Sequence, residues 1–271
     1  MDESALESRL GVPVTVFDVT PDTSGHLRRE IPDSPHGSFA VANELTAARG
    51  RSGNAWAAPA GGVWSSTLLY PDLDPEEAGR LTIAGGVAAA EAARSFGVDA
   101  RVKWPNDVVV LDGDERRKLA GVLTEAVVDA VPVVGKPVGD ALNDPGDLEA
   151  VVMGIGVNAD LDPSALETDR AVTTLRAESD EAVDREEVAA RLHERLLERA
   201  DDVETETGFG TVLDEWRDLT VTLGESVRIS VGNRVIEGTA TDVTETGALV
   251  VRTEQGREVV REGDCERLRR S

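Results

Sequence analysis

The chain has 271 residues and a mass of 28.8 kDa, which suits one large domain or a medium domain followed by a small one. Its 52 acidic and 28 basic residues give a net charge of −24, so the surface should repel nucleic-acid phosphates and we expect no DNA or RNA binding. A single cysteine, Cys265, excludes a disulfide framework, and with no signal peptide or long apolar run we expect a cytoplasmic protein with a halophile-like acidic surface.

The N-terminal part of the chain predicts strands followed by a helix. Residues 12–18 (VPVTVFD) and 62–69 (GVWSSTLL) have the composition of strands, and the second should be buried. Residues 45–71 contain no acidic residue, which creates a locally positive window suited to an anionic ligand. Asp74 can then cap a helix that carries an apolar stripe and stops at Gly97.

The middle of the chain predicts antiparallel strands and one long loop. Residues 100–111 and 118–128 are strand candidates joined by an Asp-Gly turn, which is a good hairpin signal. Residues 131–147 are rich in Pro, Gly and Asp and predict a loop. Residues 150–157 (AVVMGIGV) are entirely apolar, as expected of a strand in the core.

The C-terminal part predicts two helices and then a small all-β domain. Asp184 can cap the first helix, and a shorter helix is expected near residues 212–219. Short strand-like runs then alternate with turns, which is typical of a five-stranded barrel of SH3 type. We therefore predict an α/β fold of the α+β type, with domains at residues 1–221 and 222–271.

Lysine is almost absent from this arginine-rich chain, which makes its three lysines candidates for chemistry. Lys103 opens the run 103–107 (KWPND), in which Asn106 and Asp107 offer an amide and a carboxylate to a metal-bound phosphate or to a proton. Lys118 precedes a strand only 15 positions later. The simpler alternatives are a tight Asn-Asp turn and a solvated charge at a strand end.

Two glycine-rich segments could close on a ligand. Residues 49–53 (RGRSG) combine backbone amides with two guanidiniums, which together present donors to an anion. Residues 154–158 (GIGVN) end a core strand, where open α/β sheets tend to bind ligands. Taken alone, each segment is more simply explained as an ordinary loop or turn.

Taken in chain order, four motifs resemble those of biotin protein ligases. That family carries a GRGRxGRxW loop, then KWPND, then KLAG, then a GIGxN strand. The corresponding residues here are 48–56 (ARGRSGNAW), 103–107 (KWPND), 118–121 (KLAG) and 154–158 (GIGVN). The barrel-like C-terminus resembles the family's small C-terminal domain, so the resemblance extends over nearly the whole chain.

The resemblance implies a two-step, AMP-forming ligase whose catalytic domain contains a mixed sheet. Biotin and ATP, with Mg²⁺, would form biotinyl-5′-AMP and pyrophosphate. The biotinyl group would then pass to a lysine of a biotin carboxyl carrier protein, which is the expected partner, and a homodimer is a further option. Nothing before residue 12 resembles a helix-turn-helix, so we expect the form of the family that does not bind DNA.

The resemblance also implies roles for single residues. Lys118 would hold the biotin carboxylate and the charge developing at the α-phosphate, and Lys103 would assist at the phosphates. Asp107 would orient or deprotonate the acceptor lysine, and Arg51 would close over the intermediate with its loop. The other expected contacts to biotin or the adenylate are Thr23, Ser24, Gly25, Arg49, Gly50, Trp56, Trp104, Asn106, Gly121 and Asn158, the last near the phosphates and magnesium.

Four positions depart from the family's pattern, all on the side of biotin and its loop. Gly25 replaces the Asn of a Ser-Thr-Asn motif, and Leu45 replaces a Gln that precedes the loop. Ala48 and Asn54 replace the first Gly and the last Arg of the loop. Two alternatives therefore stay open: a ligase of the same fold that acts on a lipoyl-type acid, or a catalytically impaired paralogue that only binds ligands.

Overall fold

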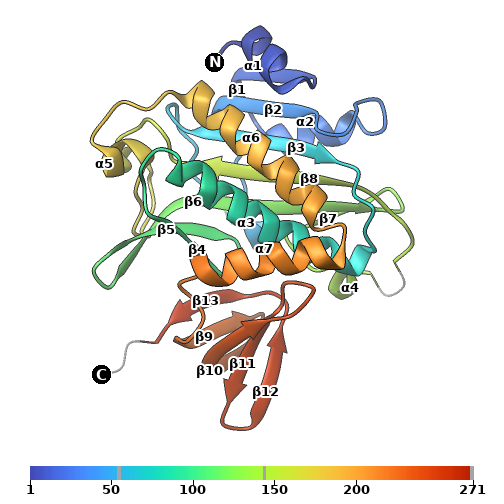
Figure 1. Cartoon of the computed structure of the whole chain (residues 1–271), viewed down its shortest axis with the longest axis vertical. Helices are drawn as coiled ribbons and strands as arrows, with labels where there is room; N and C mark the ends of the chain where they lie inside the picture. The colour runs from blue at the N-terminus through green and yellow to red at the C-terminus, as the bar shows by residue number, and fades with distance from the viewer. Residues whose placement is uncertain (54–55, 143–144, 269–271) are drawn as a thin grey trace.

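The computed structural model describes residues 1–53, 56–142 and 145–268. Its centre is an eight-stranded sheet with the order β1-β2-β3-β8-β6-β5-β4, and β7 pairs with β6 beside this path (Figure 1). Only β1 and β2 are parallel, so the sheet is mixed as expected. The strands are β1 (Val14–Thr20), β2 (Phe39–Leu45), β3 (Val63–Leu69), β4 (Ala100–Lys103), β5 (Asp107–Asp112), β6 (Glu115–Val128), β7 (Val131–Val134) and β8 (Leu148–Val157).

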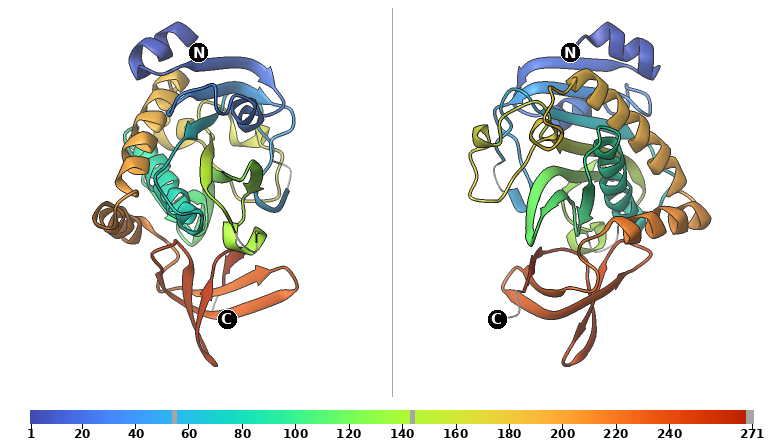
Figure 2. Two further views of the ribbon diagram at one scale, coloured as in Figure 1. Left: turned by 90° about the vertical axis from the view of Figure 1, so that its right-hand side faces the viewer. Right: turned by 60° about the vertical axis from the view of Figure 1, so that its left-hand side comes forward.

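The helices divide between the two faces of this sheet. Helices α3 and α6 pack on one face with α7 beside them, whereas α2 lies on the other face (Figure 2). The α-helices are α1 (Glu3–Leu10), α2 (Thr23–Arg29), α3 (Gly79–Arg94), α4 (Val138–Ala141), α5 (Leu175–Ser179), α6 (Arg185–Asp202) and α7 (Glu206–Leu219), and the 3-10 turns are η1 (Arg51–Gly53), η2 (Pro75–Ala78) and η3 (Pro163–Ala165). No helix in the described part of the chain is both long and apolar enough to cross a membrane.

Helix α3 confirms the helix predicted after Asp74, although its first turn is the 3-10 turn η2. The Asp74 amide donates to Glu77 Oε2 at 3.1 Å, and Gly97 ends the segment with a positive φ of 81°. Small residues let the helix approach the sheet closely, since a Cβ at Gly85 would lie 2.8 Å from Met153 Cε. This close packing compensates for a core that has few aromatic side chains.

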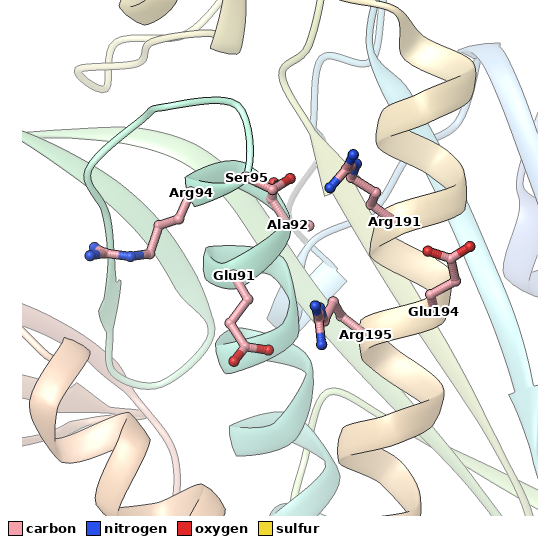
Figure 3. Close-up of a pocket in the computed structure, with 7 residues that line it drawn as sticks. All are labelled: Glu91, Ala92, Arg94, Ser95, Arg191, Glu194 and Arg195. Atoms are coloured by element: carbon pink, nitrogen blue, oxygen red, sulfur yellow. The ribbon is translucent and has the colours of Figure 1, made fainter.

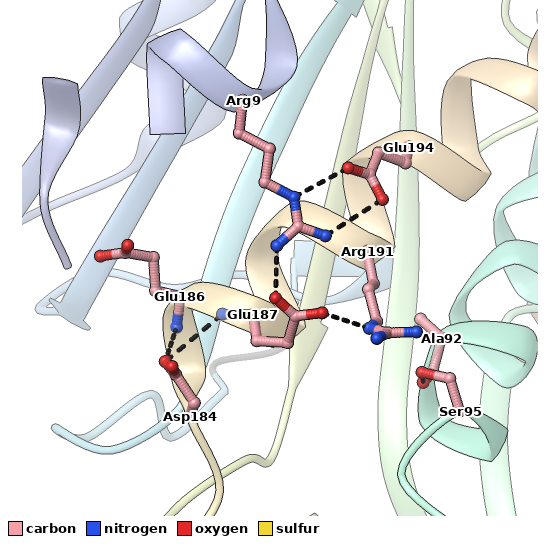
Figure 4. Close-up of polar contacts among 8 residues, drawn as sticks. All are labelled: Arg9, Ala92, Ser95, Asp184, Glu186, Glu187, Arg191 and Glu194. Carbon is pink, nitrogen blue, oxygen red and sulfur yellow. Dashed lines mark hydrogen bonds and ion pairs between the residues drawn. The ribbon is translucent and has the colours of Figure 1, made fainter. Parts of the chain in front are cut away.

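Helix α6 is capped as predicted and is joined to α1 by ion pairs. The Asp184 carboxylate accepts from two amides of the first turn, and the buried side of the helix faces α3 and β3. Arg9 of α1 contacts Glu187 and also Glu194, with 2.9 Å between Arg9 Nε and Glu194 Oε1 (Figure 4). The Arg9 guanidinium lowers the pKa of the Glu187 carboxyl. Because these side chains are partly exposed, each pair should contribute only about 0.2–1 kcal/mol.

A cavity of about 270 Å³ lies between α3 and α6 (Figure 3). Its charged side chains already have partners, because Arg191 Nε lies 2.5 Å from Glu187 Oε1 and Arg195 Nη1 lies 2.6 Å from Glu198 Oε2. Glu91 on the α3 side pairs with Arg199 at 2.5 Å. This cavity is therefore a cleft between ion-paired helices and lies away from the predicted motifs.

The C-terminal segment forms a separate five-stranded antiparallel sheet. Its strands are β9 (Ser226–Val231), β10 (Arg234–Val243), β11 (Leu249–Thr253), β12 (Gly256–Val260) and β13 (Asp264–Arg267), in the order β12-β11-β10-β9-β13. The predicted all-β segment is confirmed, and within residues 226–267 no ladder joins β12 to β13 to close the barrel. Trp104 Nε1 donates to the Gly247 carbonyl at 3.1 Å, which anchors this sheet to the larger one.

The structure differs from the sequence-based prediction in several elements. The strand predicted at residues 100–111 is two strands, β4 and β5, because the turn at Trp104 and Pro105 breaks it. The loop predicted at residues 131–147 contains β7 and α4 in its described part. Helices α1, α2 and α5 and strand β2 were missed, and α7 is longer than predicted. Short elements held mainly by tertiary contacts account for most of these differences.

Candidate active site

Three glycines leave one stretch of the central sheet without side chains on the face that α2 covers. Gly121 on β6 lies directly opposite Gly156 on β8, and Gly154 lies opposite Leu123. A Cβ at Gly121 would lie 3.0 Å from Lys118 Nζ, and one at Gly154 would lie 3.2 Å from Ser24 Oγ. The three glycines are half-buried between a lysine at one end and a hydroxyl at the other, and the Trp64 ring lies against Gly156, 3.0 Å from where a Cβ would stand.

The structure brings the two lysine motifs together. Lys118 Nζ lies 2.5 Å from Asp107 Oδ1, and Lys103 Nζ lies 3.9 Å from Asp107 Oδ2. The hairpin of β5 and β6 makes this possible, because it pairs Asp107 with Gly121 while β4 pairs Lys103 with Asp107. Trp56 completes the cluster, with its ring centroid 4.3 Å from Lys118 Nζ.

Asn106 and Trp104 have structural contacts in this arrangement. Asn106 Nδ2 donates to the Val122 carbonyl at 2.6 Å, and the Asn106 carbonyl accepts from the Val122 amide at 2.9 Å. These two bonds fix the KWPND turn on β6. Trp104 is buried against α3 and the C-terminal sheet, so the structure does not bring it into the Lys118 cluster.

Asn158 lies fully buried at the end of β8, next to the start of β6. Its Nδ2 donates to the Lys118 carbonyl at 3.2 Å and to the Thr173 carbonyl at 2.9 Å. The side chain thus contacts the backbone of the lysine-bearing segment. Its predicted place near the phosphates rests on the family resemblance alone.

The three residues predicted after the first strand, Thr23, Ser24 and Gly25, begin α2, and the first two form a buried hydroxyl cluster with Ser66. Thr23 Oγ1 and Ser24 Oγ lie 2.8 Å and 2.9 Å from Ser66 Oγ on β3. Asp22 caps the helix by accepting from the amides of Ser24 and Gly25 at 3.0 Å and 2.9 Å. Ser66 was not singled out from the sequence, where its only signal is a small polar residue in a buried strand.

A buried carboxylate, also missed from the sequence, supports this cluster. Glu125 on β6 is 3% exposed and pairs with Arg28 of α2. Burial raises the pKa of the Glu125 carboxyl, and the Arg28 guanidinium opposes that rise. Arg28 Nη2 also lies 3.6 Å from Asp22 Oδ2, so one guanidinium ties the helix cap to the sheet. An acidic residue inside an apolar strand run is the sequence signal that could have revealed it.

The arginine-bearing loop lies across the edge of β6. Arg51 Nε donates to the Gly135 carbonyl at 3.3 Å, and burial lowers the pKa of this guanidinium. Arg51 lines a cavity of about 180 Å³ between the two sheets, together with Lys136 and Arg261. Arg49 is exposed and Gly50 is half-buried. Arg51 does not join the Lys118 cluster in the structure.

The positions that depart from the family's pattern lie beside this loop. Leu45 is half-buried and packs on an apolar cluster that includes Trp64 and Ala58. Ala48 closes the loop through its carbonyl, which accepts from the Trp56 amide at 3.1 Å. Asn54 falls outside the described residues. An apolar side chain at position 45 therefore has apolar neighbours, although a glutamine there could add a donor and an acceptor.

Comparisons with known proteins agree with these motifs. Residues 16–135 match the Biotin/lipoate A/B protein ligase family, and residues 222–268 match the Biotin protein ligase C terminal domain. The chain is 30% identical over 257 residues to the bifunctional ligase/repressor BirA of Salmonella typhimurium, covering 93% of this chain and 73% of that protein. It is 28% identical over 247 residues to the biotin–[acetyl-CoA-carboxylase] ligase of Paracoccus denitrificans, covering 89% and 95%. Its fold is similar to that of the biotin protein ligase from Aquifex aeolicus in complex with biotin and ATP, with a TM-score of 0.72, 23% identity and coverage of 94% and 99%.

Proposed function

Because this chain belongs to the biotin/lipoate protein ligase family, we propose that it activates biotin with ATP and transfers it to a protein lysine. The observation that carries this proposal is the cluster in which Lys118 and Lys103 face one carboxylate, Asp107, beside the glycine-lined sheet. The acceptor is a biotin carboxyl carrier protein. The catalytic chemistry belongs to residues 1–221, followed by a C-terminal domain at residues 222–271.

In the first step, a carboxylate oxygen of biotin attacks the α-phosphorus of ATP. The bond from that phosphorus to the oxygen bridging the β-phosphate breaks, and pyrophosphate leaves with the electron pair. Both reactants are anions, so cations already in place lower the barrier by offsetting their repulsion. Lys118 and Lys103 supply two ammonium groups on the same side of the sheet.

In the second step, the neutral amine of the acceptor lysine attacks the acyl carbon and AMP leaves. The attacking nitrogen must lose a proton, and a carboxylate nearby can accept or orient it. Asp107 fits this role once Lys118 has turned toward the bound carboxylate and phosphate. The 2.5 Å contact between Asp107 and Lys118 places the proposed base and the proposed phosphate-binding cation side by side.

Magnesium enters this scheme as part of the substrate MgATP. In the described residues no group of three or more His, Cys, Asp or Glu side chains could hold a metal ion. Mg²⁺ commonly keeps several waters and binds through substrate phosphates rather than through an all-protein cage. The protein's own contribution at the phosphates is therefore cationic, from Lys118 and Lys103.

Two alternatives keep specific support. Leu45 and Gly25 stand where the family places amide side chains, which favours an acid less polar than biotin, such as a lipoyl-type acid. The same changes would also suit a paralogue that binds without catalysis. Pyrophosphate release measured with biotin, lipoate and octanoate in turn separates the three: biotin alone should support it, and release with lipoate or octanoate only, or with none, would favour an alternative. Absence of DNA binding, a cytoplasmic location and a homodimer stay predictions.

A further inference from the structure

Building on the proposed function, we propose that Asn158 is a positioning residue that holds Lys118 in place rather than a ligand of phosphate or magnesium. Its amide nitrogen donates to the carbonyls of Lys118 and Thr173 at 3.2 Å and 2.9 Å, and its side chain is fully buried. Both amide protons are thus directed at backbone oxygens. One of those oxygens belongs to the residue whose ammonium serves the reaction.

The backbone around Lys118 shows what this side chain holds together. The Lys118 amide donates to the Ala171 carbonyl, and the Thr173 amide donates to the Lys118 carbonyl, each at 2.9 Å. The backbone N–H of Asn158 donates to the Leu119 carbonyl, also at 2.9 Å. The segment around Thr173 is therefore attached to β6 on one side of Lys118, and Asn158 attaches both to the end of β8.

Asparagine suits this junction because its amide group carries two protons that can serve two carbonyls at once. Aspartate has the same shape but only accepts hydrogen bonds, so its oxygens would face two carbonyl oxygens. Serine could serve one carbonyl. Asn158 Oδ1 has no hydrogen-bond partner among the described residues, where no group of three or more His, Cys, Asp or Glu side chains could hold a metal ion. A single neutral oxygen is a weak ligand for Mg²⁺, which proteins usually bind through one or two carboxylates together with substrate phosphates.

The consequence for catalysis follows from how strictly the ammonium must be placed. A misplacement of about 1 Å at a reacting group can cost on the order of 10²-fold in rate. Without the clamp, the start of β6 and the segment around Thr173 can separate, and the Lys118 ammonium shifts with its backbone. We expect kcat for adenylate formation to fall, whereas the dependence on Mg²⁺ stays the same.

The test compares Asn158→Ala, Asn158→Ser and Asn158→Asp in pyrophosphate release with biotin and MgATP. A clamp predicts a fall in kcat of about ten- to a hundredfold for Ala, a smaller fall for Ser, and a fall for Asp at least as large as for Ala. Half-saturation by Mg²⁺ should stay within about twofold of the wild type. A metal ligand predicts the opposite order, because Asp would bind Mg²⁺ at least as well as Asn. Asn158→Asp with nearly normal activity would overturn the inference.

A double-mutant cycle asks whether Asn158 acts through Lys118. In the Lys118→Ala background, Asn158→Ala should cost little more, since the group that it positions is gone. Independent, multiplicative losses would contradict the proposal. Asn233→Asp, in the exposed turn between β9 and β10, is the charge-matched control and should leave the rate unchanged.

Amide hydrogen exchange separates local loosening around Lys118 from a general loss of stability in the Asn158 variants. The amides of Lys118 and Thr173 should exchange faster in Asn158→Ala, while amides in the core of α3 keep their protection. Equal protection at both amides in the wild type and the variant would contradict a clamp. A wild-type protein that forms no adenylate from any acid would instead overturn the proposed function, whereas an active wild type with an equally active Asn158→Ala overturns this inference alone.

Discussion

Replacing Lys118 by methionine should nearly abolish adenylate formation while the protein stays folded. The structure shows lysine ammoniums at 2.5 Å and 3.9 Å from a carboxylate, which are the distances at which they would meet a bound anion. Two unit charges about 4 Å apart interact by about 4 kcal/mol at an effective dielectric of about 20. At about 1.4 kcal/mol per tenfold, this interaction sets an upper limit of roughly a thousandfold on the loss. Mutations of similar groups in other enzymes cost about 10²–10³ in rate, so we expect a fall of that order.

The fold should survive this change because Asp107 keeps Lys103 as a partner at 3.9 Å and is not left as an isolated charge. Initial rates of pyrophosphate release with biotin and MgATP measure the effect. The matched control is Arg257→Met, which removes an exposed cation on β12 of the C-terminal sheet and should leave the rate near that of the wild type. A Lys118→Met protein with an unchanged melting temperature and a rate within about threefold of the wild type, far from the 10²-fold loss expected, would refute the role of this cation.

Three further predictions follow from the loop, the departures and the core. Arg51→Gly should still form the adenylate but release it, so that bystander lysines become labelled; labelling confined to the carrier at the wild-type rate would argue against a closing loop. Leu45→Gln should tighten biotin about ten- to a hundredfold in calorimetry, since leaving one buried polar group of biotin without a partner costs about 1–3 kcal/mol; no change would show that other groups satisfy the ureido ring. His193 is buried beside Thr67, and burial lowers its pKa from 6.5 to about 4. The unfolded chain therefore binds a proton that the folded protein refuses between these pH values, so the free energy of unfolding should fall by up to about 3 kcal/mol as the pH drops through that window. Denaturant titrations at pH 7 and pH 4.5 give the free energy of unfolding at each pH. In His193→Gln the loss of this free energy between the two pH values should be smaller than in the wild type. An equal loss in both proteins would contradict a neutral buried histidine.

The residues of the Lys118 cluster could be singled out from the sequence because they are close along the chain. Lys103, Asp107 and Lys118 lie on β4, β5 and the start of β6, so one local meander brings them together. The capped helices were also predictable, because Asp74 and Asp184 signal their starts locally. Where an element or a contact depends on residues close along the chain, composition and spacing were sufficient to predict it.

The remaining parts of the site depend on contacts between distant segments. Ser66 meets the start of α2 across 42 residues or more, and Glu125 meets Arg28 across 97. No pattern within either segment reveals such a partner. The bond from the Trp104 indole nitrogen to the Gly247 carbonyl could not be read from the sequence either, and the expected place of Trp104 at the adenylate stays a prediction, although it lines the same cavity as Arg51. Tertiary packing decides which neighbours such a side chain contacts.

The structure also changes how the departure at Gly25 should be tested. A Cβ at this position would lie 2.6 Å from Asp22 Oδ2, which accepts the Gly25 amide and caps α2. Gly25→Asn would therefore disturb the helix start as well as add an amide. Leu45→Gln alone is the cleaner change, because Leu45 is half-buried at the end of β2 and has room to adjust.

The most direct test of the central proposal is the intact mass of a biotin carboxyl carrier domain after incubation with this protein, MgATP and biotin. The proposed function predicts the mass increase of one biotinyl group on one lysine, dependent on ATP and lost in Lys118→Met. An unmodified carrier in the presence of biotin, with modification by lipoate instead or with neither acid, would contradict it.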